Sequence, residues 1–229
     1  MTMTTYVHHR IACGPRRWKA VADHLVHGAE ALAGAGGALY GLWRSQIGRP
    51  RDEVTAVTSW QEPIEAADAE ARLKSLGAGF EAVSSRTMMP TLRPSEASPP
   101  TRQGNYAFRW FVTPEKHWDE FLDLCAGAWP GFEAAYDSQV IGLWRCSADQ
   151  VAGDPAFPMP AVGKSDVVSL MLSRRPDLAM WERSKVPQGA KETAVRDALS
   201  RRYDLCDWTA VYTTTLLTAT DRVDMARWT

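Results

Sequence analysis

The sequence predicts an α+β protein made of two similar βαββαβ units, whose sheets pack against each other and close a barrel within one chain. Two observations predict this architecture. The tetrapeptide Gly41-Leu-Trp-Arg44 recurs as Gly142-Leu-Trp-Arg145, and the residues on either side repeat in the same order. Large apolar residues occupy both faces of the strands at these tetrapeptides, which is typical of a sheet covered on both sides. We expect a first unit over residues 1–93, a linker over 94–104 and a second unit over 105–229.

Each element of the first unit has a local signal. Pro15 suits the first turn of a helix, and apolar residues then recur from Trp18 onward with the period of an α-helix. Glycines within residues 34–37 end this helix, and Gly77 and Gly79 end the next one. Runs rich in β-branched and aromatic residues indicate the strands. The expected elements are strands over residues 4–13, 38–47, 53–61 and 81–92 and helices over residues 18–32 and 63–76.

The second unit repeats these signals with two insertions. Pro114 precedes an amphipathic helix, and one insertion lengthens the helical stretch after Pro176. The other insertion, over residues 148–163, is interpreted either as a lid or as a packed structural loop. The expected elements are strands over residues 105–113, 140–145, 167–171 and 210–217 and a helix over residues 118–132.

The composition argues against several partners. The chain has 229 residues, 45% of them hydrophobic, and a net charge of −1, so it has no basic excess for binding nucleic acid or an anionic membrane. No apolar run is long enough to cross a bilayer, and the first residues lack the pattern of a signal peptide, which together predict a cytoplasmic protein. The four cysteines form no CxxC pair, so we expect reduced structural thiols.

A resemblance to a family emerges at the first tetrapeptide. Gly41-Leu-Trp-Arg-Ser-Gln-Ile-Gly48, followed by Val54–Trp60, resembles the strand, turn and strand signature of the NIPSNAP family, within the dimeric α/β-barrel superfamily. Phe108–Phe111 is similar to the arginine-bearing first strand of that family, whereas Cys146–Asp149 departs from its turn. The resemblance implies two ferredoxin-like units forming an intrachain pseudo-dimeric α/β barrel. It implies little about chemistry, because that superfamily includes cofactor-independent monooxygenases, heme-handling enzymes and members without a settled activity.

The first strand carries the candidate catalytic residues. Strand alternation places Tyr6, His8 and Arg10 on one face. If this face lines the barrel interior, His8 supplies a base and Arg10 stabilises negative charge on an enolate or oxyanion. Arg109, in the first strand of the second unit, is the alternative to Arg10 in that role. The other interpretation is that a histidine here only satisfies hydrogen bonds within the strand.

Aromatic residues of the second unit are expected opposite this strand. Tyr106, Phe108 and Trp110 share a face, and with Tyr6 they favour a pocket for a small aromatic compound. Trp60 is a further candidate for this pocket. Ordinary divergence of the two units is the alternative explanation for the same asymmetry.

The arginines of the two tetrapeptides occupy matching positions. Arg44 is expected on the same face as Tyr40 and Leu42, among apolar neighbours. A buried cation needs an anion, so Arg44 and Arg145 bind either a carboxylate ligand or a structural acid. The structural acids considered are Asp52, Glu53 and Asp166. The candidate ligand-binding residues are therefore Tyr6, Tyr40, Arg44, Trp60, Tyr106, Phe108, Trp110 and Arg145.

These residues predict a small-molecule enzyme that acts on a hydrophobic, oxygenated compound in the barrel without a tightly bound cofactor. Two alternatives stay open: a non-catalytic ligand-binding or interaction protein whose barrel is filled by side chains, and a heme-binding member of the superfamily. No metal site is expected, because His24 and His27 lack a third ligand in register, and no phosphate loop, GxSxG or HExxH motif occurs. The expected partners are a small hydrophobic or aromatic molecule and, as an open question, a second copy of the chain.

Overall fold

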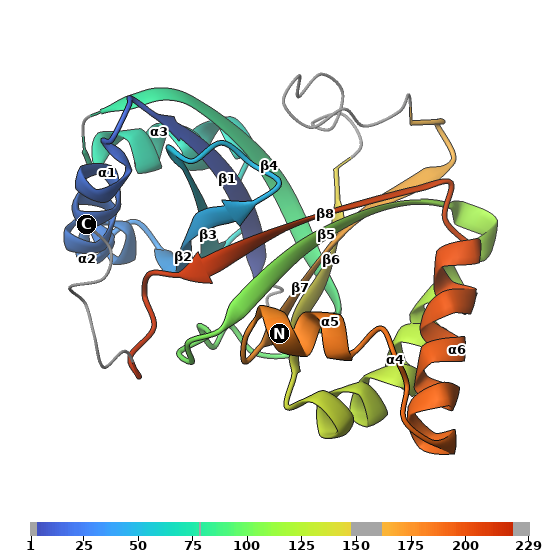
Figure 1. The fold of residues 1–229 in the computed structure, drawn as a ribbon. Helices are drawn as coiled ribbons and strands as arrows, with labels where there is room; N and C mark the ends of the chain where they lie inside the picture. The colour runs from blue at the N-terminus through green and yellow to red at the C-terminus, as the bar shows by residue number, and fades with distance from the viewer. Residues whose placement is uncertain (1–3, 78, 148–161, 222–229) are drawn as a thin grey trace.

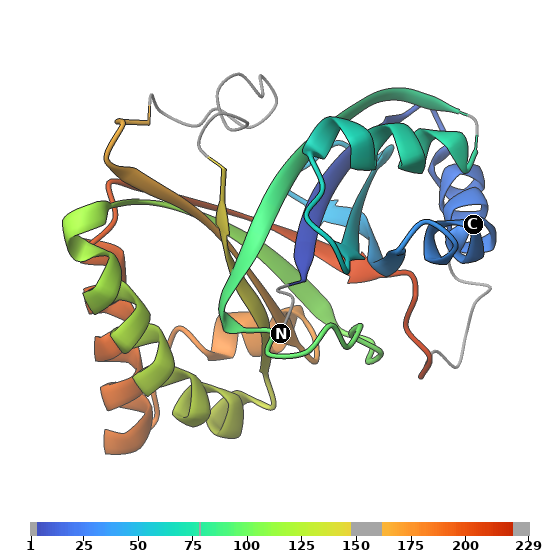
Figure 2. The ribbon, with the colours of Figure 1, turned by 180° about the vertical axis from the view of Figure 1, so that it is seen from behind.

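The computed structural model describes residues 4–77, 79–147 and 162–221, and it contains a closed barrel of antiparallel strands. The strand order around the barrel is β1-β3-β2-β8-β5-β7-β6-β4. Helices lie outside the barrel in two groups, α1 to α3 beside one half and α4 to α6 beside the other, as Figures 1 and 2 show from opposite sides. In the part of the chain that the structure describes, no helix has the length and apolar character that a membrane crossing requires.

The first unit has the order βαββαβ, with its first helical stretch divided in two. Its sheet has the strand order β4-β1-β3-β2, so β1 and β3 are central. The bounds are β1 (Thr5–Cys13), α1 (Trp18–His27), α2 (Ala29–Ala33), β2 (Gly37–Ile47), β3 (Glu53–Trp60), α3 (Ala66–Ser75) and β4 (Phe80–Arg93).

The second unit repeats this order, with a 3-10 turn before its first helix and two helices in place of α3. Its sheet has the matching order β8-β5-β7-β6. The bounds are β5 (Asn105–Pro114), η1 (Glu115–His117), α4 (Trp118–Tyr136), β6 (Gln139–Cys146), β7 (Asp166–Arg175), α5 (Leu178–Arg183), α6 (Ala190–Asp204) and β8 (Trp208–Leu216).

The two sheets join at both edges. β2 pairs with β8, where Trp43 lies opposite Leu216, and β4 pairs with β6, where Met88 lies opposite Cys146. Each of the described strands β1 to β8 therefore has two hydrogen-bonded neighbours, and none of them is an open edge. The predicted fold class, two ferredoxin-like units forming one barrel, is confirmed.

The first predicted helix differs in detail. The helix expected over residues 18–32 is two helices, because the chain breaks at Gly28. A Cβ at Gly28 would lie 2.9 Å from the Cβ of Leu76, so the close approach of two segments requires glycine there. The insertion expected over residues 148–163 lies almost wholly outside the described residues. The lengthened stretch after Pro176 forms α5 and α6.

A β-bulge in each unit changes which residues face the interior. The register shifts between Leu39 and Gly41, and again between Val140 and Gly142. As a result Tyr40 belongs to the barrel core together with Trp43, while Leu42 packs under the helices. The expectation that Tyr40, Leu42 and Arg44 share one face is wrong, because strict alternation fails at a bulge.

Candidate functional site

The first strand presents its predicted residues to the barrel interior. Tyr6 belongs to the barrel core, and the ring of His8 lies edge-on to Phe108 and Trp110, with centroids 5.7 and 5.4 Å apart. The expected opposition of a polar strand and an aromatic strand is therefore present.

His8 is buried and neutral. Its Nε2 lies 3.0 Å from the hydroxyl of Tyr212, and its side chain is 3% exposed. Burial, followed by the positive charge of Arg86, holds the pKa of His8 well below its usual value. Its Nδ1 has no hydrogen-bond partner among the described residues. The ring can accept or pass on a proton only if a reacting group reaches it.

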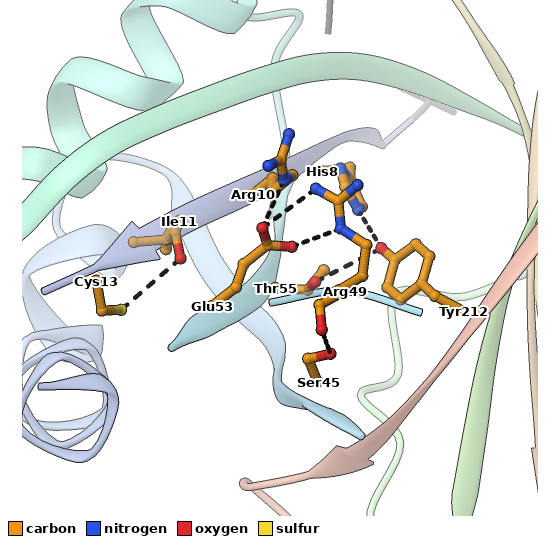
Figure 3. Close-up of polar contacts among 9 residues, drawn as sticks. All are labelled: His8, Arg10, Ile11, Cys13, Ser45, Arg49, Glu53, Thr55 and Tyr212. Carbon is orange, nitrogen blue, oxygen red and sulfur yellow. Dashed lines mark hydrogen bonds and ion pairs between the residues drawn. The ribbon is translucent and has the colours of Figure 1, made fainter. Parts of the chain in front are cut away.

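Arg10 is held by an ion pair. Its Nε donates to Oε2 of Glu53 at 2.7 Å, and Arg49 Nε donates to the other carboxylate oxygen at 2.8 Å. Figure 3 shows Glu53 between these two guanidinium groups, beside Thr55 and the His8–Tyr212 pair. Glu53, which was considered as a partner for Arg44 or Arg145, thus neutralises Arg10 and Arg49 instead.

Aromatic side chains fill the middle of the barrel. Tyr6 contacts Tyr40 at 5.2 Å between centroids, and Phe108 stacks on Tyr212 at the same separation. Tyr106 packs on Trp43 and donates its hydroxyl proton to the carbonyl oxygen of residue 102 at 2.5 Å. Four of the predicted ligand-binding residues therefore contact other core side chains at this level of the barrel.

Four other predicted residues lie outside the barrel. Arg109 is on the face of β5 opposite Phe108 and Trp110, so grouping it with His8 is wrong, because successive strand residues point to opposite faces. Trp60 packs under α3, where its Nε1 donates to Thr58 at 2.9 Å.

The two tetrapeptide arginines also point away from the interior. Arg44 lies over the ring of Trp18 in α1, 4.0 Å from its centroid. Arg145 pairs with Glu115 at 2.8 Å, and both side chains are about half exposed. Neither arginine lines the barrel, and the acid that Arg145 binds is none of the three that were considered.

A second site lies between the sheet of the second unit and its helices. It is a pocket of about 270 Å³ whose floor is formed by β5, β6 and β7 and whose walls are formed by α4, α5 and α6. Figure 1 shows these three helices beside the strands of the second unit. Its lining residues are Arg109, Trp129, Phe132, Val140, Met171, Ser173, Arg175, Trp181, Ser184, Lys185, Arg196, Leu199, Arg202 and Tyr203. This lining contains five cationic residues and no carboxylate.

Three arginines define the electrostatics of this pocket. Arg175 lies over Trp181, 4.2 Å from the ring centroid, and Arg109 and Arg202 lie over Tyr203 at 5.3 and 4.9 Å. Within the described ranges, no carboxylate oxygen comes within 4.0 Å of these three guanidinium groups. Their guanidinium groups lie against aromatic rings, and Arg202 also forms hydrogen bonds with Cys125 and Tyr203.

Arg202 is the most deeply buried of the three. It is 2% exposed, and its Nη1 donates to the sulfur atoms of Cys125 and Met171 at 3.7 and 3.6 Å. Its guanidinium also has a hydrogen bond with the side chain of Tyr203, and its Nε has no partner among the described residues. Burial, and then the charges of Arg109 and Arg202, lower the pKa of Arg175 to about 10. For Arg202 itself, Cys125 and Tyr203 outweigh the effect of burial and raise the pKa. The lowered pKa of Arg175 indicates a site arranged for negative charge.

Tyr203 responds to the same charges. Burial raises the pKa of its hydroxyl, but Arg202 and Arg109 outweigh burial, so the net pKa lies below the usual value. The hydroxyl is therefore the group in this pocket best suited to hold or release a proton.

Sequence reasoning missed Arg175, Arg202 and Tyr203. Arg202 follows Arg201 in a polar helix, and a local pattern does not distinguish the arginine that points inward from its exposed neighbour. One signal for this pocket was available in the sequence. If Trp110 points into the barrel, strand alternation places its neighbour Arg109 on the side of the helices.

The pocket does not suit a histidine-ligated heme or a metal ion. The histidines lie in β1, in α1 and in η1, and none lines the pocket. No group of three or more histidine, cysteine, aspartate or glutamate residues could hold a metal ion in the described parts of the chain. The heme-binding alternative therefore has no axial histidine in this pocket.

Comparisons with known proteins agree with the fold. A candidate monooxygenase from Lactobacillus acidophilus NCFM superposes with a TM-score of 0.56 and 8% identity, over 95% of this chain and 97% of the other. An anthrone oxidase-like protein gives a TM-score of 0.54 and 12% identity, over 95% and 92%. A chlorite dismutase mutant from Candidatus Nitrospira defluvii gives 0.55 and 8%, over 94% and 92%. No family model and no curated protein matches the chain. At these identities the likeness concerns the dimeric α/β-barrel fold alone.

Proposed function

We propose that this protein binds a small, partly aromatic and oxygenated molecule in the pocket between the second sheet and α4, α5 and α6. The observation that carries the proposal is the pocket itself, which has a volume of about 270 Å³ and combines aromatic walls with a few polar groups. The predicted barrel residues pack on one another instead. We therefore place the binding site on the helix-covered face of the second unit and not inside the barrel, where the sequence predicts it.

The lining supports a ligand with a flat apolar body. Trp129, Phe132 and Trp181 supply aromatic surface, while Ser173 and Ser184 supply short hydroxyl groups. Tyr203 adds a hydroxyl with a lowered pKa, which can exchange a proton with a bound compound. This set of groups serves an enzyme or a binding protein.

Filling the pocket tests this proposal. 2-Naphthoate and its neutral isostere 2-naphthamide are the probes, and binding is measured by isothermal titration calorimetry. Leu199→Trp adds an indole from α6 into the pocket and should abolish binding of any probe that the unchanged chain binds. Leu92→Trp, at an exposed leucine of β4, is the matched control and should bind normally. Binding of neither probe to the unchanged chain, or equal binding to both variants, contradicts the proposal.

A second candidate function is a reaction catalysed inside the barrel, at His8. His8 has a free Nδ1, while its Nε2 is held by the Tyr212 hydroxyl, and this arrangement favours proton abstraction by a neutral imidazole, as in a cofactor-independent monooxygenase. The anthrone oxidase-like neighbour suggests anthrone as the probe: loss of a proton gives an enolate, and O₂ then converts it to anthraquinone and water. His8→Ala should abolish anthraquinone formation, and His24→Ala, at an exposed histidine, should not. Absence of catalysed turnover in the unchanged chain contradicts this candidate.

We also propose two more specific points, the relation to the NIPSNAP family and a cytoplasmic location. The NIPSNAP resemblance of residues 41–48 and 54–60 is supported by their form in the structure, where β2 and β3 join through a turn at Gly48, whose φ is +93°. A cytoplasmic location is supported by the four cysteines, all of which are free thiols.

A further inference from the structure

We infer that the ligand of this pocket is an organic anion, an aromatic carboxylate whose negative charge is bound by Arg109, Arg175 and Arg202. The inference rests on the proposed function, because it takes the pocket as the binding site, and it adds the chemical class of the ligand. Three observations carry it: the missing counter-charge, the commitment of nearby acids to other arginines, and the contrast with the first unit.

The missing counter-charge is clearest at Arg202. A buried guanidinium without an anion is costly, because its hydration is lost and no ion pair replaces it. Arg202 is 2% exposed, and its polar contacts are the sulfur atoms of Cys125 and Met171 and the hydroxyl of Tyr203, with Nε left unpaired among the described residues. Nε and Nη1 of Arg175 are buried without partners among the described residues. Donors left free in this way can form two or more charge-assisted hydrogen bonds with one carboxylate.

The acidic side chains near the pocket already form ion pairs with other arginines. Glu192 accepts two hydrogen bonds from Arg183, at 2.7 and 2.9 Å. Glu120 accepts from Arg201 on the outer side of α6, at 3.0 Å. Cys125, the thiol beside Arg202, is neutral because burial raises its pKa above the usual value despite that arginine. Arg201, which points outward from α6, is thus paired with a carboxylate. Arg202, which points inward, has none among the described residues and is available to a bound anion.

The first unit acts as an internal control. His9 occupies in β1 the place that Arg109 occupies in β5, since both sequences align at Tyr6 and Tyr106. The ring of His9 lies 2.9 Å from Thr58 and 2.8 Å from Ser85, and Ser85 donates to Glu70 of α3 at 2.7 Å. In the first unit this position carries a histidine in a satisfied network that ends on a carboxylate. In the second unit the matching position carries a cation, Arg109, that lines a pocket without a carboxylate.

The aromatic part of the ligand follows from how the guanidinium groups are held. Arg175 is stacked on Trp181 and lies 5.0 Å from the ring centroid of Phe132, so its N–H edges stay free while its faces are covered. Trp129 and Phe132 extend the apolar wall beyond it. A flat ring fits between these walls with its carboxylate directed at the N–H edges.

Charge preference is the direct test. In calorimetric titrations at low ionic strength, the unchanged chain should bind 2-naphthoate about tenfold or more tightly than 2-naphthamide, since hydrogen bonds to charged groups are the strong ones. Arg175→Met keeps the apolar stem and should lower the affinity for naphthoate by about tenfold or more while changing that for naphthamide less than twofold. Arg201→Met, at the paired arginine next to Arg202, is the control and should leave both affinities unchanged.

Thermal stability gives a second readout. Arg202→Met removes a buried charge, so it should raise the melting temperature of the ligand-free protein and at the same time weaken naphthoate binding. A variant that melts lower and binds normally would show that Arg202 supports only the fold, and would contradict the inference.

The remaining outcomes separate the two proposals. Equal affinity for naphthoate and naphthamide, with Leu199→Trp abolishing both, overturns the anionic ligand and leaves the pocket as the site. Equal affinity for inorganic phosphate and naphthoate overturns the inference that the bound anion is aromatic. Binding of no probe overturns the pocket and the ligand class together.

Discussion

The indole of Trp43 occupies the space into which a side chain at Gly41 would extend, since a Cβ there would lie 2.3 Å from the ring carbon Cη2 of Trp43. Gly142 and Trp144 have the same relationship, with the same distance. Both indoles are fully buried in the barrel core. The repeated tetrapeptide is therefore a packing device, in which a glycine at a bulge accommodates the ring two residues later.

Replacing the glycine of this pair with a larger residue should destabilise the protein. Gly142→Ala forces Trp144 out of its position, and we expect it to lower the free energy of unfolding by about 1–3 kcal/mol. Gly127→Ala is the matched control: Gly127 lies in α4 with nothing within 4 Å of an added Cβ, and alanine there should stabilise by about 0.5–1 kcal/mol. Urea unfolding measures both values. Equal effects of the two substitutions would refute the packing argument.

The fold could be predicted because it depends on a pattern that occurs twice. Each unit repeats the apolar period of its helices, and matching positions such as Trp18 and Trp118 are buried in both. The bulges could not be predicted, because an extra residue in a strand leaves no regular trace in an alternating pattern. That shift is why Tyr40 and Trp43 point inward together while Arg44 points outward.

The candidate site was predicted only in part, for a different reason. His8 and Arg10 reach the interior as alternation requires, but Glu53, which neutralises Arg10, is recognised only from the paired strands. Arg202 comes from a helix far from β5 in sequence, and its burial depends on how α6 packs against α4. Contacts between distant segments decide which arginine is paired and which is not.

Glu53 should be among the most sensitive acids of this protein. Glu53→Gln leaves Arg10 and Arg49 without their shared carboxylate in a buried place, and we expect a loss of about 3–5 kcal/mol in the free energy of unfolding. Glu115→Gln breaks the half-exposed pair with Arg145 and should cost about 0–1 kcal/mol. Chemical denaturation at pH 7 compares them. Similar losses would show that Glu53 is not the counter-charge of both arginines.

His9 should make stability fall in acid. Trp60 donates to Thr58, so the Thr58 hydroxyl proton is free for Nε2 of His9, and Ser85 donates to Glu70, so it accepts from Nδ1–H. The ring is thus neutral, and burial lowers its pKa to about 3. Below the ordinary value of about 6.5 the unfolded chain binds a proton that the folded chain does not, so stability is lost from there down to about pH 3.

The size of this loss can be measured. Between pH 7 and pH 4.5, His9 should account for about 2–3 kcal/mol of the decrease in the free energy of unfolding. His9→Gln should lower stability at pH 7 and flatten the pH dependence by that amount. His24→Gln, at an exposed histidine of α1, should reproduce the unchanged curve. A pH dependence that persists in His9→Gln would mean that other groups cause it.

Tyr203 should ionise before the other buried tyrosines. Arg202 and Arg109 lower its pKa against the effect of burial, whereas burial raises the pKa of Tyr6 to about 12 and that of Tyr40 further. In a titration of phenolate absorbance at 295 nm, we expect Tyr203→Phe to remove the first transition. Arg109→Met should shift that transition to higher pH, because it removes one of the charges that stabilise the phenolate.

A bound anion should act on this transition in the same direction. 2-Naphthoate placed among the three arginines neutralises part of their charge, so the first transition should move to higher pH, while 2-naphthamide should leave it in place. Arg201→Met, at an arginine paired with Glu120, should change neither the free nor the bound titration. If naphthoate binds and the transition stays where it was, the carboxylate lies away from Tyr203 and the arginines beside it.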